Sequence, residues 1–383
     1  MLRFVLDALI EQGFQPVVAF YKPYSEAAHL SVPLFRIGRG RVRSQRETWL
    51  GRYDAHAIGC WLPELEFTHY LPTRHWRELM DACEFHISVS GNCLAATGST
   101  LRGRPNLAWV ATPWHGDRKD RVAHFPLIRR ILDRLLNRHF LLSLERKILR
   151  RCAVLALSEY TRKELDALAG KVLDVMPMPV DTQTFAPDPD AVVIGRVGFS
   201  GRFNDPRKNM PLLLAAVRIA RRDGLDLHLE LIGDQSSPEL LEMVRVAGLE
   251  GCVQIMPHLD RAILAEHLRG LDVFVVPSHQ EGLCIAALEA MASGCPVVST
   301  RCGGPEEFVR DAYSGYCVDF DAEAMAQALG RIVRDRRLRK HLAEGARATV
   351  VARYQVDVAR AIFWRAFNVT FGTIIIYQQS GEN

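Results

Sequence analysis

Short apolar runs alternate with amphipathic segments along the second half of the chain. The apolar runs are far shorter than the roughly 20 residues that a membrane-spanning helix needs. We interpret them as buried strands at 192–199, 227–232, 253–256, 273–276 and 296–299. Between them, apolar residues recur at helical spacing, which predicts helices at 238–246, 261–268 and 283–293. Because strands and helices alternate, the pattern predicts an α/β fold with a parallel sheet covered by helices.

The first half of the chain shows a less regular version of this pattern. A helix is expected from Leu2 to the stop at Gly13. Further predicted elements are strands at 17–21, 85–90, 107–112, 153–157 and 172–176, and helices at 76–83 and from Ser158 onward. The pattern predicts no clear helix or strand from Lys22 to about His69. This region contains Arg36, Arg39, Arg41, Arg43 and Arg46. We interpret this run as a solvated loop, with contact to an anionic acceptor as the lesser alternative.

Proline marks the expected junction between two domains. Pro177, Pro179, Pro187 and Pro189 follow the predicted strand at 172–176. Further helices are expected at 322–333, 337–350 and 356–367. A chain of 383 residues is long enough for two α/β domains joined at such a linker.

Composition narrows the classes of function. A net charge of +4 gives no reason to expect nucleic acid as a partner. The 9 cysteines are scattered without C-x-x-C or zinc-site spacing, which suits a reducing cytosol. We find neither a signal-peptide pattern nor a membrane-spanning apolar run, and we therefore expect a cytoplasmic protein.

Two glutamates stand out in the strand–loop–helix unit around residue 281. Glu281 lies in the loop after the strand at 273–276, and Glu289 lies about two turns into the next helix. Such a loop lies at the carboxyl edge of a parallel sheet, where the helix N-terminus favours phosphate. A carboxylate accepts hydrogen bonds from two neighbouring hydroxyls, so two of them beside a pyrophosphate suit a ribose and a sugar. This pattern predicts a nucleotide-sugar site; the alternative is two solvated surface charges.

A basic loop follows the strand at 192–199. It contains Arg202, Arg207 and Lys208 after Gly201. A departing pyrophosphate needs fixed cations where its charge develops, and arginine and lysine supply them as a fork and a point charge. Basic residues on an ordinary surface loop are the alternative interpretation.

The sequence from Glu281 to Val298 resembles the E-x7-E signature of the retaining GT-B glycosyltransferases of the group one family. The family text is close to E-G-F-G-x-x-x-x-E-A-M-A-x-G-x-P-V-V. The matching residues are Glu281, Gly282, Glu289, Ala290, Met291, Ala292, Gly294, Pro296, Val297 and Val298. Cys284 stands where the family usually has glycine, the residue that allows the backbone to approach phosphate closely.

This resemblance implies a GT-B fold, with two Rossmann-like doubly wound parallel-sheet domains facing a cleft. It implies an acceptor-side domain at 1–186, a nucleotide-sugar-binding domain at 187–355, and a helix that crosses back with a tail at 356–383. The family has a strand and a glycine-rich turn before its first helix, and we expect this domain to lack them.

The resemblance also assigns roles to individual residues. Arg202 and Lys208, in the pattern G-R-x-x-x-x-x-K, would hold the diphosphate, while Glu289 would hold ribose and Glu281 the sugar. The implied donor-binding set is Gly201, Arg202, Lys208, Glu281, Gly282, Leu283, Cys284, Ile285 and Glu289. Gly303 and Gly304, in a sequence that resembles the family's G-G-x-x-E loop, are expected to turn the chain beside the donor.

His115 is the candidate contributed by the first half. It follows the strand at 107–112, and it resembles the family histidine that lines the sugar site. With Arg202, Lys208 and Glu281 it completes the expected catalytic set. A capping or packing role for His115 is the open alternative.

The segment 125–151 is basic and amphipathic. Its leucines and isoleucines alternate with eight Arg and Lys residues. A helix of this kind can lie on anionic lipid, which would make the protein peripheral on the inner membrane face. More often such a helix packs its apolar face on its own domain.

Three functions remain open from the sequence. The first is a retaining hexosyltransferase that moves a sugar from a nucleoside diphosphate to a glycan or lipid-linked acceptor in cell-envelope polysaccharide or glycolipid synthesis. It would need no metal and no cofactor, and the D-x-D pairs Asp188/Asp190 and Asp319/Asp321 are interpreted as surface residues. The alternatives are a non-catalytic nucleotide-sugar-binding relative and a nucleotide-sugar epimerase on the same fold.

Overall fold

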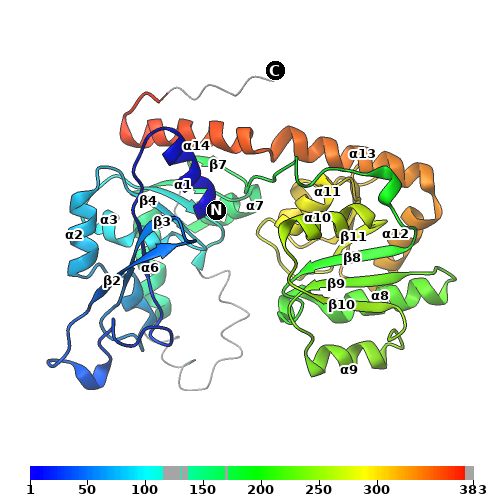
Figure 1. Ribbon diagram of the computed structural model, residues 1–383, viewed down its shortest axis with the longest axis horizontal. Helices are drawn as coiled ribbons and strands as arrows, with labels where there is room; N and C mark the ends of the chain where they lie inside the picture. Colours follow the sequence, from blue (N-terminus) through cyan, green and yellow to red (C-terminus); the bar gives the residue numbers. More distant parts are fainter. Residues whose placement is uncertain (115–129, 131–136, 169–170, 376–383) are drawn as a thin grey trace. The chain divides into compact units, whose positions relative to one another are not determined.

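The computed structural model describes residues 1–114, 130, 137–168 and 171–375. The chain folds into two compact units (Figure 1). Unit 1 comprises Met1–Leu157, Thr161–Met176 and Arg360–Asn383, and unit 2 comprises Ser158–Tyr160 and Pro177–Ala359. The long segment of unit 2 thus begins at Pro177, and the chain returns to unit 1 at Arg360. The domain boundaries expected from the sequence lie after residues 186 and 355.

Unit 2 is built on one 6-stranded sheet in which every strand pair is parallel. The strands lie in the order β10-β9-β8-β11-β12-β13. They are β8 (Arg196–Gly201), β9 (His228–Gly233), β10 (Val253–Pro257), β11 (Val273–Val276), β12 (Val297–Thr300) and β13 (Gly315–Val318). All residues of β11 and β12 are buried, as central strands of a parallel sheet must be.

Helices cover both faces of this sheet. They are α8 (Met210–Arg222), α9 (Pro238–Val246), α10 (Arg261–Gly270), α11 (Ile285–Ala292), α12 (Ala322–Arg334) and α13 (Arg336–Arg353). Helix α8 contacts α9 and α12, while α11 contacts α10 and α13. In Figure 1, α9 is drawn below the strands of this sheet, and α10 and α11 are drawn above them. Leu213 of α8 and Leu329 of α12 are fully buried with Val197, Leu229 and Val273 in the core of this unit.

Unit 1 contains two smaller sheets. A 3-stranded sheet has the order β1-β3-β2, with β1 parallel and β2 antiparallel to β3. A 4-stranded parallel sheet has the order β4-β5-β6-β7. The strands are β1 (Val18–Tyr21), β2 (Ser44–Trp49), β3 (Tyr53–Ile58), β4 (Ile87–Ser90), β5 (Leu107–Val110), β6 (Ala153–Ala156) and β7 (Asp174–Val175).

The helices of unit 1 include the last long helix of the chain. They are α1 (Leu2–Glu11), α2 (Arg74–Ala82), α3 (Thr97–Leu101), α6 (Arg138–Leu149), α7 (Glu159–Leu168) and α14 (Val356–Phe371); α7 and α14 each begin in unit 2. The rings of Trp364 and Phe367 in α14 contact Phe14, and Phe367 also contacts Phe85. These rings attach the end of the chain to unit 1.

Short 3₁₀ helices complete the described structure. They are η1 (Leu34–Arg36), η2 (Glu66–Tyr70), η3 (Cys93–Ala96), η5 (Pro189–Ala191), η6 (Pro206–Lys208) and η7 (Gly304–Glu307). Across the described ranges, no helix is both long and apolar enough to cross a bilayer.

The sequence interpretation was wrong at several places. The region from Lys22 to about His69 contains the hairpin β2–β3, and β13 was not predicted. Strand β8 begins at Arg196 because Gly195 has a φ of 81°, which is incompatible with a strand. Helix α11 begins at Ile285 because Cys284 has a φ of 68° and cannot belong to the helix.

Candidate functional site

The candidate site lies where the strand order of unit 2 reverses. After β8 the chain builds β9 and β10 on one side, and β11, β12 and β13 occupy the other side. Strands β8 and β11 are therefore neighbours, and the loops at their carboxyl ends meet. The backbone N–H of His279 donates to the carbonyl of Arg207 at 2.8 Å. In open parallel sheets, ligands bind at this switch point.

Local capping shapes the loop after β8. The side chain of Asp205 accepts a hydrogen bond from the backbone N–H of Arg207 at 3.0 Å and so begins η6. Asn209 ends η6 in the left-handed conformation, with a φ of 50°, and α8 begins directly after it. This short turn fixes where Lys208 leaves the backbone.

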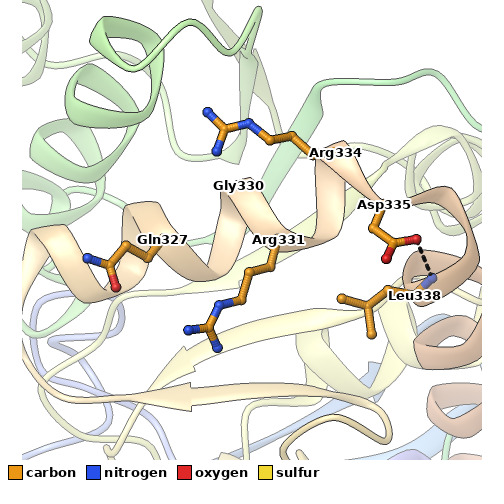
Figure 2. Close-up of a pocket in the computed structure, with 6 residues that line it drawn as sticks. All are labelled: Gln327, Gly330, Arg331, Arg334, Asp335 and Leu338. Atoms are coloured by element: carbon orange, nitrogen blue, oxygen red, sulfur yellow. Dashed lines mark hydrogen bonds between the residues drawn. The ribbon is translucent and has the colours of Figure 1, made fainter.

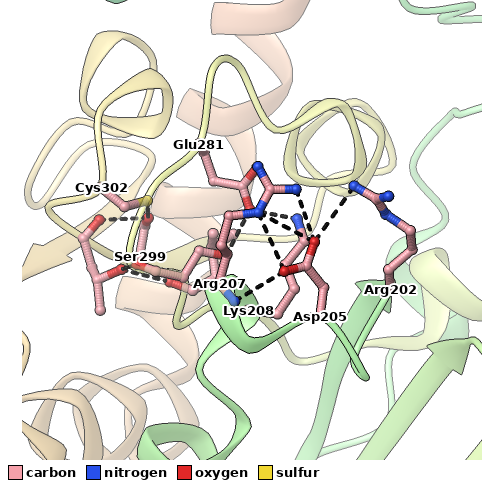
Figure 3. Close-up of polar contacts among 10 residues, drawn as sticks. Arg202, Asp205, Arg207, Lys208, Glu281, Ser299 and Cys302 are labelled. Carbon is pink, nitrogen blue, oxygen red and sulfur yellow. Dashed lines mark hydrogen bonds and ion pairs between the residues drawn. The ribbon is translucent and has the colours of Figure 1, made fainter. Parts of the chain in front are cut away.

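Lys208 and Glu281 form an ion pair across the two loops (Figure 3). The Nζ of Lys208 donates to Oε1 of Glu281 at 2.6 Å, and the two side chains are only 16% and 11% exposed. The buried hydroxyl of Ser278 donates to the same Oε1 at 2.6 Å. Burial alone would lower the pKa of Lys208, but the charge of Glu281 raises it above its ordinary value. Lys208 is therefore a fixed cation at the switch point.

Arg202 and Arg207, the two arginines of this loop, differ in exposure and in their distance from Asp205. A guanidinium nitrogen of Arg207 lies 2.8 Å from Oδ2 of Asp205, and both side chains are about four-fifths buried. Burial opposes ionisation of Asp205, but hydrogen bonds from Arg207 lower the pKa of that carboxyl. Arg202 lies 3.6 Å from the same oxygen and is 70% exposed (Figure 3). The structure thus leaves Arg202 more accessible to an anion than Arg207.

The glycine pair after β12 supports the loop that carries Glu281. The backbone N–H of Glu281 donates to the carbonyl of Cys302 at 2.7 Å, and the N–H of Gly304 donates to the carbonyl of Glu281 at 2.9 Å. A Cβ on Gly304 would lie 2.6 Å from the Cα of Leu283. Gly303 has a φ of 103°, which other residues rarely adopt. The two glycines allow the backbones to approach closely beside Glu281.

The start of α11 completes this side of the site. Cys284 occupies the N-cap position, and burial and the nearby Glu281 charge raise the pKa of its thiol well above the usual value. Leu283 is buried, and Ile285 is 37% exposed. A left-handed conformation at Cys284 suits glycine better, so this chain carries a side chain at a glycine-like backbone position.

Glu289 lies on α11, in its second turn. Burial raises the pKa of its carboxyl to about 7, and the charge of Arg261 acts in the opposite direction. Within the described part of the chain, the Glu289 side chain has no hydrogen-bond or ion-pair partner. Its oxygens are therefore available to a ligand.

The sequence interpretation missed three residues of this site. Ser278 contacts Glu281 directly, and Thr300 donates to the carbonyl of Ser278 at 2.6 Å. Asp205 holds both arginines of the β8 loop. A Pro-Ser pair at the end of a buried strand and an Asp-Pro pair before a basic dipeptide were the available signals.

Two further sequence predictions can be compared only in part. His115 lies outside the described residues. Of the segment 125–151, the structure describes residue 130 and residues 137–151. There, Leu141, Leu144, Ile148 and Leu149 of α6 are buried in the core of unit 1. In the described part of this segment, the apolar face packs on its own unit, as the packing alternative expects, and lipid contact through 125–151 stays a prediction.

The described residues give no group of three His, Cys, Asp or Glu side chains that could hold a metal ion. In the two D-x-D pairs, Asp188 and Asp321 accept backbone hydrogen bonds that begin η5 and α12. These two aspartates have a structural role.

A pocket of about 510 Å³ lies elsewhere in unit 2, where α12 meets α13 (Figure 2). It is lined by Gln327, Gly330, Arg331, Arg334, Asp335 and Leu338. Arg334 donates to the carbonyl of Asp223, and Asp335 caps the start of α13. Its main charged groups therefore have structural roles, and none of the predicted site residues lines it.

Comparison with known proteins identifies the domain that contains the switch point. Residues 195–335 match the family model described as Glycosyl transferases group 1. This part of the chain is a group 1 glycosyl transferase domain. The match covers both loops of the site, so Arg202, Lys208, Glu281 and Glu289 all lie within the group 1 domain.

Curated relatives of the group 1 domain include two bacterial enzymes. The chain is 32% identical over 219 residues to D-inositol 3-phosphate glycosyltransferase of Xylanimonas cellulosilytica, a match that covers 51% of this chain and 52% of that protein. It is also 32% identical over 242 residues to phosphatidyl-myo-inositol mannosyltransferase of Mycolicibacterium smegmatis, covering 61% of each chain. The matches thus span between half and three-fifths of these relatives' lengths.

The likeness of fold extends beyond the group 1 domain. Sucrose-phosphate synthase from Thermosynechococcus elongatus superposes with a TM-score of 0.73 at 20% identity, covering 97% of this chain and 92% of that one. At this identity the likeness concerns the fold alone. The predicted GT-B class, with two Rossmann-like units, is confirmed. That the two units face a cleft stays a prediction.

Proposed function

We propose that the protein is a retaining glycosyltransferase that moves a hexose from a nucleoside-diphosphate sugar to an acceptor hydroxyl. The observation that carries this proposal is the meeting of Lys208 and Glu281 at the switch point of the group 1 domain. Both residues come from loops at the carboxyl ends of neighbouring strands. A mostly buried cation and a carboxylate with further hydrogen-bonding capacity suit a phosphate and a sugar hydroxyl.

The diphosphate would be held by Lys208 and Arg202. Lys208 supplies a fixed charge, and the exposed Arg202 can turn its fork toward phosphate oxygens. Backbone N–H groups at the start of α11, after Gly282, Leu283 and Cys284, would add a partial positive charge. These groups would stabilise the leaving diphosphate without a metal or other cofactor.

The carboxylates would orient the two sugars of the donor. Glu281 retains free lone pairs beside its contacts with Lys208 and Ser278, and would accept from hydroxyls of the transferred sugar. Glu289, in the second turn of α11, would accept from the ribose hydroxyls. We retain His115 as the proposed group that assists at the reacting side of the sugar.

The acceptor would be a glycan or lipid-linked molecule of the cell envelope, and the enzyme would act in the cytoplasm. The relatives support this acceptor class, because their names include inositol 3-phosphate and phosphatidyl-myo-inositol as molecules that are glycosylated. Both are polyol phosphates. Inositol phosphate and phosphatidylinositol are therefore the first acceptors to test.

Donor binding is tested by thermal shift with UDP-, GDP- and ADP-sugars on three proteins. We expect at least one donor to stabilise the wild type and the Glu250→Ala control, whose altered side chain is exposed and lies outside both loops. The same donor should stabilise Glu281→Ala much less, since the sugar loses its carboxylate. If no donor stabilises the wild type, the proposed function is wrong.

Turnover is tested by measuring release of nucleoside diphosphate with and without acceptor. A transferase releases it mainly when acceptor is present. Donor binding without release would instead indicate a non-catalytic binding relative. Incorporation of solvent deuterium into the unchanged donor would indicate an epimerase.

A further inference from the structure

An exposed apolar tip surrounded by arginines lies in unit 1, outside the proposed donor site. Leu34, Phe35 and Ile37 are 67%, 74% and 52% exposed. They belong to the loop between residues 33 and 43, which we call the basic loop and which includes η1 (Figure 1). Three large apolar side chains within four residues are unusual on a surface that contacts only water.

The charges around this tip are mostly positive, and Glu64, which accepts from the N–H of Leu34, lies beside them. Arg36, Arg39, Arg41, Arg43 and the adjoining Arg46 are exposed, and the sequence has no Asp or Glu between Glu26 and Glu47. Within the described residues, none of these five arginines forms an ion pair. The guanidinium of Arg36 lies 5.6 Å from the ring centre of Phe35. The basic loop therefore presents apolar surface together with an excess of positive charge.

The loop is held in this conformation by its own hydrogen bonds. The N–H of Leu34 donates to Oε1 of Glu64 at 3.1 Å, and the N–H of Gly40 donates to the carbonyl of Arg36 at 3.0 Å. Arg43 closes the loop by donating its N–H to the carbonyl of Leu30 at 2.9 Å. These bonds fix the backbone while the apolar side chains remain in solvent, so their exposure does not result from fraying.

We propose that the basic loop binds the surface of an anionic lipid bilayer. Leu34, Phe35 and Ile37 would enter the interfacial layer, and the arginines would contact lipid phosphates. A soluble polyanion would leave the apolar tip in water, whereas an uncharged apolar partner would leave five arginines without counter-charge. An anionic bilayer satisfies both. The proposal does not depend on the transfer reaction, because the loop contains no proposed donor-site residue.

The basic loop also differs from the surface that the sequence suggested for lipid contact. In α6, the apolar face is buried in the core of unit 1, whereas the apolar residues of the basic loop are exposed. The proposed lipid contact is therefore made by the basic loop, which would insert only its apolar tip, and not by helix α6.

Co-sedimentation with vesicles tests the proposal. We expect the full-length wild type to bind phosphatidylcholine vesicles that contain 30% phosphatidylserine, and to bind pure phosphatidylcholine at least tenfold more weakly. The variant Arg39→Gln/Arg41→Gln should lose about fivefold in partitioning for each arginine removed. The control Arg222→Gln/Arg337→Gln, which removes exposed arginines of unit 2, should bind as the wild type does.

The apolar tip is tested separately. Leu34→Ser/Phe35→Ser/Ile37→Ser should bind at least tenfold more weakly, while Leu241→Ser/Val246→Ser, which alters exposed residues of α9, should bind normally. Unchanged thermal unfolding would show that these variants are folded. In Phe35→Trp, brominated lipid should quench more fluorescence than in the wild type, because the new indole enters the bilayer.

Three outcomes would overturn the proposal. The first is failure of the wild type to bind anionic vesicles. The second is equal binding by the wild type and the triple serine variant, which would place the contact elsewhere. The third is salt-sensitive binding without additional quenching in Phe35→Trp, which would indicate a surface for soluble polyanions or for an acidic protein.

Discussion

At the scale of single residues, burial changes the pKa of the Glu289 carboxyl and makes folding stability depend on pH. Burial raises its pKa to about 7, so in the folded protein the carboxyl keeps its proton to a higher pH than in the unfolded chain. Below the unfolded pKa, both states are protonated and the group has no effect. As pH rises toward 7, the unfolded state ionises first, and folding stability is lost progressively. Above pH 7 the penalty is complete, at most on the order of 3 kcal/mol for such a shift.

Substitution of Glu289 by glutamine should separate stability from binding. Glu289→Gln cannot ionise, so it should be more stable than the wild type at pH 8, and the difference should shrink as the pH falls and vanish below about pH 4. At pH 8, where Glu289 is ionised, the same variant should bind the donor at least tenfold more weakly, because ribose loses a carboxylate acceptor. Urea unfolding between pH 4 and pH 8 measures the stability difference, and calorimetric titration at pH 8 measures donor binding. A stability difference that does not depend on pH would contradict the proposed ionisation.

The sequence suggested which residues have suitable chemistry for the site, but it did not show which side chains they contact. Glu281 and Glu289 were proposed from residue type and spacing, and Arg202 and Lys208 were paired through the resemblance to the family; that they bind a donor stays a prediction. Ser278 was not recognised as a site residue, because its hydrogen bond to Glu281 depends on how a loop folds.

At the scale of elements, the site depends on the fit of the 303–304 turn against the loop at 281–283. The carbonyl of Glu281 accepts the N–H of Gly304, and a Cβ on Gly304 would approach backbone atoms of Gly282 and Leu283 to less than 3.0 Å. Backbone atoms cannot turn aside as the end of a flexible side chain can. The position of Glu281 is thus coupled to a glycine in a different loop.

The variant Gly304→Ala should therefore displace the loop that carries Glu281. We expect it to reduce stability by roughly 2 kcal/mol and to weaken donor binding at least tenfold. Gly251→Ala is the matched control, since a Cβ there meets no atom within 4 Å. Chemical denaturation and donor titration measure both effects. Equal behaviour of the two variants would show that the close approach at Gly304 has no role in the site.

Elements with a strong apolar pattern were predicted well, and those without one were not. Strand β11 was predicted at its observed bounds because four consecutive buried apolar residues form it. The hairpin β2–β3 was missed because β2 is mostly polar and partly exposed, and its turn uses Leu50 and Gly51 at positive φ, without an Asn-Gly signal. The spacing of apolar residues indicates which face of an element is buried, so an edge strand without a buried face shows no clear pattern in the sequence.

At the scale of the whole chain, strand order determines which loops can form the site. The sequence predicted alternating strands and helices, but the adjacency of β8 and β11 is a long-range pairing that no local pattern encodes. That adjacency brings Lys208 to Glu281 from positions 73 residues apart in the chain. The fold class could be predicted from pattern and resemblance, whereas the convergence of the two loops was expected from the resemblance alone and its contacts required the structure.

The central claim is that this convergence forms a diphosphate site in the group 1 domain. Its most direct test is the affinity of UDP, GDP and ADP for the wild type, for Lys208→Met, and for Lys340→Met, which alters an exposed lysine of α13. Isothermal titration calorimetry should show that at least one nucleotide binds the wild type and Lys340→Met equally. Lys208→Met should bind that nucleotide at least tenfold more weakly, because a charge-assisted contact is lost. Undiminished binding by Lys208→Met, or no binding of any nucleotide by the wild type, would contradict the account.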